Sequence, residues 1–134
     1  MKLEYFSKDL ADNGFGVLGE TIFLYSMPPE CIKGIMLNTD RSGVKYDWNL
    51  PHFFKSNLQV IVRAQNHADG ELLAKQVSDY LQSSSERIYI NTLGQPEMIV
   101  KFLLPQNLPI RYPRLDGNGI EWSINLETAY TMIP

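Results

Sequence analysis

Residues 114–127, RLDGNGIEWSINLE, carry oxygen-bearing side chains at part of the spacing of a calcium-binding loop. An EF-hand loop takes oxygen ligands from its first, third, fifth and twelfth positions and needs a glycine at the sixth. Three positions carry a suitable side chain: Asp116, Asn118 and Glu127. However, Ile120 occupies the fifth position and Glu121 the sixth. Because two central requirements fail, the sequence predicts no metal site here.

The same segment has the composition of a tight turn that leads into a strand. Glycine, asparagine and aspartate tolerate positive φ angles better than other residues do. The predicted structural turn consists of Asp116, Gly117, Asn118 and Gly119. Apolar and polar residues then alternate, as expected for a strand with one buried face. The apolar positions are Ile120, Trp122, Ile124 and Leu126, and we expect this strand to extend over residues 120–132.

Residues 14–19, GFGVLG, spell the glycine pattern of a dinucleotide-binding loop. That fingerprint requires a strand before the glycines and a helix after them, so that phosphate meets a helix N-terminus. The surrounding sequence favours the reverse order, a helix before the glycines and a strand after them. We therefore interpret the segment as a connection, and the sequence predicts no cofactor.

Cysteine and histidine are the remaining candidates for catalysis or metal binding, and the candidates are Cys31, His52 and His67. They lack the paired spacing of a zinc site, and no serine stands in a G-x-S-x-G elbow. Cys31, close to Pro28 and Pro29, has the setting of a small apolar side chain rather than of a reactive thiolate. The sequence thus predicts a protein that is not an enzyme. A small enzyme that uses Cys31 or a histidine, and a small-ligand-binding domain, remain alternatives.

Residues 46–54, YDWNLPHFF, form an aromatic-rich segment, in which we expect Pro51 to prevent a regular element. Its aromatic residues are Tyr46, Trp48, Phe53 and Phe54. Such a segment either folds back over the core or docks on another subunit, where tryptophan and tyrosine are favoured anchors. Both interpretations stay open, so these residues are candidate interface residues.

Residues 108–115, LPIRYPRL, read as an extended arm whose prolines restrict the backbone. Extended arms often lie along a neighbouring subunit. The candidate subunit or partner contacts in this arm are Arg111, Tyr112, Pro113 and Arg114.

Hydrophobic periodicity predicts the elements that position these segments. We expect helices over residues 2–12 and 69–82, with Asp69 as the N-cap of the second. We expect strands over residues 20–27, 34–39, 57–66, 87–92, 98–104 and 120–132. The order lacks regular β-α-β alternation. The predicted fold is therefore α+β, a mostly antiparallel sheet with a short N-terminal helix and the central helix packed on one face, in one domain over residues 1–134.

Length and charge exclude several classes of protein. The chain has 134 residues and a net charge of −3, and nucleic-acid-coating proteins are basic instead. A single cysteine cannot form an internal disulfide. No segment approaches the roughly 20 apolar residues that cross a bilayer. We therefore expect a protein that is made in a cytoplasm and has no membrane partner.

Taken together and in order, these segments resemble the tail terminator proteins of long-tailed bacteriophages (siphophages), often labelled minor capsid proteins. The similarity includes IFLYSMPPE, GIMLNTDRSGVKYDWNLP, LQVIVRAQNHADGELLAKQVSDYL and LPIRYPRLDGNGIEWSINLETAY. It extends through nearly the whole chain.

The resemblance implies structural work in a virion, at the junction between head and tail, after assembly in the host cytoplasm. Proteins of this family form a ring, usually a homohexamer, that caps the tail tube and stops its polymerisation. The implied partners are further copies of the chain, the tail tube protein and a head-completion or neck protein, with DNA only passing through the channel. The nearest alternative is itself a neck or head-completion protein.

Overall fold

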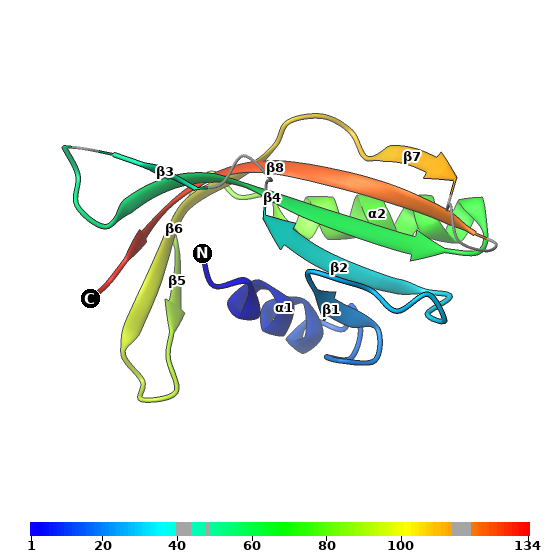
Figure 1. Ribbon diagram of the computed structural model, residues 1–134, viewed down its shortest axis with the longest axis horizontal. Helices are drawn as coiled ribbons and strands as arrows, with labels where there is room; N and C mark the ends of the chain where they lie inside the picture. Colours follow the sequence, from blue (N-terminus) through cyan, green and yellow to red (C-terminus); the bar gives the residue numbers. More distant parts are fainter. Residues whose placement is uncertain (40–43, 48, 114–118) are drawn as a thin grey trace.

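The computed structural model describes residues 1–39, 44–47, 49–113 and 119–134, which form eight strands and two helices (Figure 1). The helices are α1 (Leu3–Asp12) and α2 (His67–Leu81). The strands are β1 (Ile22–Leu24), β2 (Gly34–Thr39), β3 (Lys45–Tyr46), β4 (Phe53–Ala64), β5 (Arg87–Ile90), β6 (Pro96–Pro105), β7 (Ile110–Pro113) and β8 (Ile120–Met132). The fold is α+β, as predicted.

All the strands belong to one sheet with the order β1-β2-β4-β8-β6-β5. Two short strands lie beside this path: β3 pairs with β4, and β7 pairs with β8. Only β1 and β2 are parallel among the strand pairs that the structure describes, so the sheet is mostly antiparallel, as expected. The long strands β4 and β8 are the two central strands of the sheet. They pair along nearly their whole length, from Phe53 opposite Thr131 to Ala64 opposite Ile120.

Both helices cover the same face of the sheet. The residues of β4 and β8 that face the helices are buried, and part of the opposite face is buried as well, at Ile61, Arg63 and Ser123. The strands contribute Leu58, Val60, Val62, Trp122, Ile124 and Leu126 to a single core cluster. The helices contribute Leu3, Phe6, Leu10, Ala74, Val77 and Leu81 to that cluster. Because one cluster joins both helices to one sheet face, the opposite face carries no helix among the described residues.

Helix α2 begins two residues before its predicted start. Its N-cap is Asn66, whose Oδ1 accepts a hydrogen bond from the backbone N–H of Asp69 at 3.1 Å. The prediction that Asp69 caps the helix is therefore wrong. Asparagine and aspartate are about equally good caps, so composition alone could not choose between them. Four residues beyond the cap, Gly70 lies directly against the indole of Trp122.

Several predicted strands have different ends in the structure. Strand β1 covers only Ile22–Leu24, and it ends before Tyr25, which adopts a φ of +67°. Strand β4 begins at Phe53, so the expectation that residues 46–54 contain no regular element is wrong. Strand β6 begins at Pro96, two residues before its predicted start at residue 98. A proline is tolerated as the first residue of a strand because it need not donate to the ladder there.

Candidate assembly surfaces

The predicted interface residues lie at opposite ends of β8. Phe53 and Phe54 are opposite Thr131 and Tyr130 near the carboxyl end of β8. Strand β7 pairs with residues 120–123 at its amino end. At roughly 3.4 Å per residue, these positions are on the order of 25 Å apart. The structure therefore separates the aromatic segment from the arm, and they do not form one site.

Part of the aromatic segment packs against its own chain. The ring of Phe54 lies 5.4 Å from that of Tyr130, a buried core residue. Phe53 is half-buried, and Tyr46 is opposite Phe54 in the backbone ladder of β3 and β4. Trp48 lies outside the described residues. Phe54 thus packs on the core of its own chain. An interface role for the segment stays a prediction.

The arm forms an edge strand of its own sheet. In β7, Arg111 is exposed and Tyr112 is half-buried. Burial and the nearby carboxylate of Glu121 raise the pKa of Tyr112 above its ordinary value. Pro113 ends the strand. Arg114 lies outside the described residues.

The predicted turn before β8 is described only at its last residue, Gly119. Its φ is +124°, and a Cβ there would stand 3.1 Å from the carbonyl oxygen of Ala64. Glycine is therefore required at this position. Asp116, Gly117 and Asn118 lie outside the described residues. The strand that follows, in place of the helix that leaves an EF-hand loop, confirms the strand predicted for residues 120–132.

The residues considered for catalysis are separated or engaged in structural contacts. The thiol of half-buried Cys31 donates to the carbonyl of Lys33 at 3.1 Å. His67 opens α2, 3.7 Å from Glu71, whereas His52 lies exposed in the turn before β4. The described residues contain no group of three or more histidine, cysteine, aspartate or glutamate side chains arranged to hold a metal ion. The GFGVLG segment connects α1 to β1, the reverse of a dinucleotide-binding order, as predicted.

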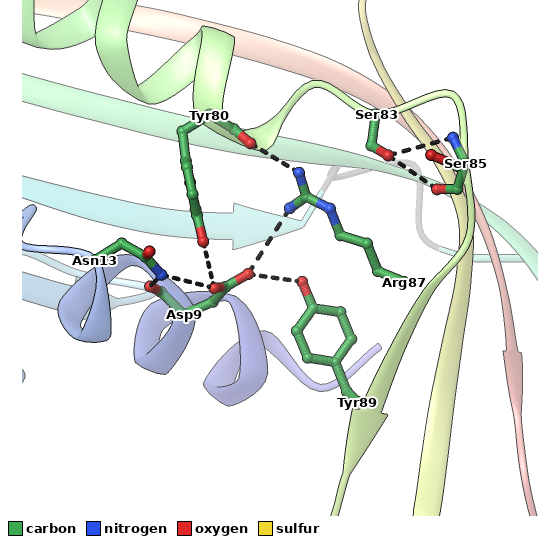
Figure 2. A network of polar contacts seen from close by, with 7 residues as sticks. All are labelled: Asp9, Asn13, Tyr80, Ser83, Ser85, Arg87 and Tyr89. Carbon is green, nitrogen blue, oxygen red and sulfur yellow. Dashed lines mark hydrogen bonds and ion pairs between the residues drawn. The ribbon is translucent and has the colours of Figure 1, made fainter.

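A polar cluster that sequence analysis missed ties α1 to α2 and β5 (Figure 2). At its centre, Asp9 accepts hydrogen bonds from the hydroxyls of Tyr80 at 2.6 Å and Tyr89 at 3.1 Å. The guanidinium of Arg87 lies 3.7 Å from the same carboxylate and donates to the carbonyl of Tyr80 at 2.7 Å. The Nη1 of Arg87 is buried without a hydrogen bond among the described residues. Electrostatic attraction to the carboxylate of Asp9, 3.7 Å away, therefore stabilises the positive charge at this nitrogen.

A second polar contact joins the start of α1 to β6. The hydroxyl of Tyr5 donates to Glu97 at 2.7 Å, and Lys2 forms an ion pair with the same carboxylate. Both contacts lower the pKa of Glu97, the bond from Lys2 most strongly. Beside these contacts, an open groove of about 910 Å³ lies between α1 and β5.

Half-buried Tyr89 and buried Tyr130 predict a loss of stability at alkaline pH. Burial, reinforced by Asp9, raises the pKa of Tyr89 well above its ordinary value of 10.0, and burial raises the pKa of Tyr130 to about 12. Because the folded state holds the proton more tightly, this stabilisation is complete below the ordinary pKa and is lost as the pH rises above it. We expect the free energy of unfolding, measured by urea titration, to fall from about pH 10 upward.

The variant Tyr89→Phe isolates the contribution of one hydroxyl to this pH dependence. Lysines also titrate in this range, so the comparison with the unsubstituted protein is the informative quantity. We expect a shallower decline in the free energy of unfolding in Tyr89→Phe. Identical slopes for the two proteins would contradict the assignment.

These observations define an α+β fold with two helices on one face of its sheet and uncovered strand edges among the described residues. The chain belongs to the bacteriophage tail terminator protein family, whose model matches residues 10–132. No match to the chain is found among curated proteins. The protein is therefore a structural protein of phage tail assembly and a component of the virion. Among the described residues, neither helix has the length and apolar composition needed to span a membrane.

Proposed function

We propose that this protein forms a ring of six subunits on the end of the tail tube, where it stops tube polymerisation and joins the tail to the head. The observation that carries the proposal is the family match over residues 10–132. The architecture supports it as well. A sheet with helices on one face presents two chemically different surfaces, and a capping ring needs one surface for the tube and another for the head.

Ring closure restricts how the subunits meet. Head-to-tail contacts use two different patches of each subunit, and they give a closed ring only when successive rotations return to the start. The two ends of β8 carry different groups, aromatic side chains at one and the β7 arm at the other. The chain thus offers distinct patches at its two ends, as such a contact requires.

The proposed partners are further copies of the chain, the tail tube protein and a head-completion or neck protein. Fixed cations in the channel would bind the phosphates of DNA. The proposal is that the channel lacks such cations, so that DNA passes through without being held. The net charge of −3 agrees with this, and Lys101 is paired with Glu86 at 2.9 Å. A cryo-microscopy map in which Lys101, Arg111 or Arg114 lines the channel would contradict this part of the proposal.

The proposed location is the head–tail junction of the virion, after assembly in the host cytoplasm, and the role is not enzymatic. Replacing Cys31 by serine removes the only thiol of the chain. We propose that this change leaves tail assembly and phage growth unaltered. Loss of infectivity with normal folding would favour the alternative of a small enzyme.

Tail length in virions that lack the protein tests the proposal directly. Without a terminator the tube continues to polymerise, so electron microscopy is expected to show overlong tubes. A neck or head-completion protein would instead leave tails of normal length that fail to attach to heads. Normal, unattached tails would therefore replace the proposed function with that alternative.

Native mass tests the ring itself. Six chains of 15.3 kDa give about 92 kDa. We expect light scattering to find this mass either for the isolated protein or for the protein released from capped tubes. A monomer under both conditions would contradict the ring.

A further inference from the structure

The sheet ends at β5, whose outer edge carries no partner strand among the described residues. There, β5 pairs only with β6. A strand edge of this kind presents N–H and C=O groups that can pair with another strand. The groove of about 910 Å³ lies between this strand and α1. An added strand would therefore continue the sheet and lie beside α1.

The face of β5 that points away from the helices is apolar and exposed. Ile88 is opposite Ile99, which is opposite Thr131, on the sheet face that carries no helix among the described residues. Ile88 and Ile90 are each 56% exposed. Two neighbouring isoleucines left this open on a strand edge form an apolar patch that is suited to contact with a partner.

The β7 arm is a second open edge, at the other end of the molecule. In the part of the chain that the structure describes, β7 pairs only with β8. Figure 1 places β7 and β5 far apart in the molecule, with β7 beside the amino end of β8 and β5 at one end of the sheet order. Ile110 is 48% exposed and lies opposite Ser123, on the same face as Ile88. Arg111 is exposed and projects from the other face, the one that the helices cover.

The charges of the groove complement those of the arm. Four carboxylates and three cations line the groove: Glu4, Asp9, Asp12, Glu97, Lys2, Lys8 and Arg87. Two ion pairs, Lys2 with Glu97 and Arg87 with Asp9, neutralise four of these groups. Among the side chains that line the groove, Glu4 and Asp12 then remain against Lys8, an excess of one negative charge. Glu4 also interacts with the N-terminal amino group of Met1.

We propose that β7 of one subunit pairs edge to edge with β5 of the next copy of this chain, so that one sheet continues from subunit to subunit. The inference rests on the proposed ring, and it assigns the contact between its subunits. Both strands have four residues. In the orientation that we propose, the helix-covered faces of the two subunits lie on the same side of the sheet, so Ile110 meets Ile88 and Ile90, while Arg111 reaches the groove beside α1.

The prolines of the arm keep this contact short. Proline has no N–H to donate, and proline in edge strands limits unwanted pairing. Pro109 precedes β7 and Pro113 is its last residue, so its backbone donors come from Ile110, Arg111 and Tyr112. Alternate residues of a strand donate to opposite edges, so only some of these donors face away from β8. The backbone pairing between the two subunits is therefore short and cannot extend beyond the two prolines.

Cysteine cross-linking tests which edges meet. In a Cys31→Ser background, Ile88→Cys and Ile110→Cys are combined in one chain, and a bis-maleimide that spans about 10 Å is added, which tolerates a shift of about two residues in register. The sample is the ring on tail tubes, or the ring in solution where native mass shows one. We expect a ladder of covalent oligomers in which cross-linked dimer and larger species dominate.

The matched control pairs Ile110→Cys with Leu72→Cys, an equally exposed position on α2 (58%). A ring with no more cross-linking in the test pair than in the control overturns the inference and leaves the proposed function standing. Cross-linking of the Ile88→Cys thiol to the tube protein instead of to another copy also overturns it. Failure to find any ring, with tails of normal length, removes the proposed function and the inference together.

Reversing the charge of the arm gives a second readout. We expect Arg111→Glu to reduce ring assembly by roughly tenfold or more, because like charges then face each other across the contact. Changing both Glu4 and Asp12 to lysine in the same chain is expected to restore assembly. Lys75→Glu on the exposed face of α2 serves as the control. Arg111→Glu assembling like the unsubstituted chain, with the same melting temperature, would overturn the inference.

Discussion

Replacing Arg63 by alanine is expected to lower the free energy of unfolding by about 3–5 kcal/mol, because it leaves the other members of a largely buried polar cluster without their partner. The Nε of Arg63 donates to Glu121 at 2.9 Å. Its Nη1 donates to the carbonyls of Pro28 at 2.9 Å and Cys31 at 3.1 Å. Only 10% of the arginine side chain and 14% of the Glu121 side chain are exposed, so water cannot replace these bonds fully. Urea titration measures the loss.

An exposed ion pair gives the matched control for Arg63. Lys101 and Glu86 are also 2.9 Å apart, but 35% and 56% of their side chains are exposed. Lys101→Ala is therefore expected to cost less than about 1 kcal/mol. The double variant Arg63→Leu with Glu121→Leu is expected to be more stable than Arg63→Ala, because no buried charge is left unpaired. A loss below about 1 kcal/mol for Arg63→Ala would refute the interpretation.

The elements with long and regular patterns were predictable from the sequence. The bounds predicted for β8, residues 120–132, agree with the structure. Apolar and polar residues alternate from Ile120 to Glu127, and the residues that follow, up to Met132, are mostly β-branched or aromatic. Strand β4 was recognised from its alternating half, but its start at Phe53 was not. Aromatic residues after a proline fit a loop as well as a strand, and here pairing with β8 decides between them. The short strand β7 lies between two prolines, so it too depends on β8 and has no local signal.

The polar clusters could not be predicted, because their members are far apart in the chain. Asp9 is 71 residues from Tyr80 and 80 residues from Tyr89. No local spacing reveals such a contact. The pair formed by Arg63 and Glu121 is different, because these residues are directly opposite each other on β4 and β8. Opposite charges at facing positions stabilise strand pairs, so knowledge of this register would have been enough to predict the pair.

Gly70→Ala is expected to destabilise the protein by about 3 kcal/mol, at the upper end of the usual cost of overfilling a core. A Cβ at this position would stand 2.0 Å from Cζ3 and 2.2 Å from Cη2 of Trp122. The indole is 2% exposed, so it cannot move aside without disturbing the core. In an ordinary helix interior the same change would stabilise by about 1 kcal/mol. The sign of the measured change in unfolding free energy therefore decides whether α2 lies this close to the sheet.

A double-variant cycle assigns the effect of Gly70→Ala to its contact with the indole. In a Trp122→Leu background the ring is absent, so Gly70→Ala is expected to lower the free energy of unfolding much less than in the unsubstituted protein. The effects of substitutions at two residues in contact are not additive. Lys75→Ala, on the exposed face of the same helix, is the control and is expected to change the free energy of unfolding by less than about 0.5 kcal/mol. Equal costs of Gly70→Ala in both backgrounds would show that the destabilisation arises elsewhere.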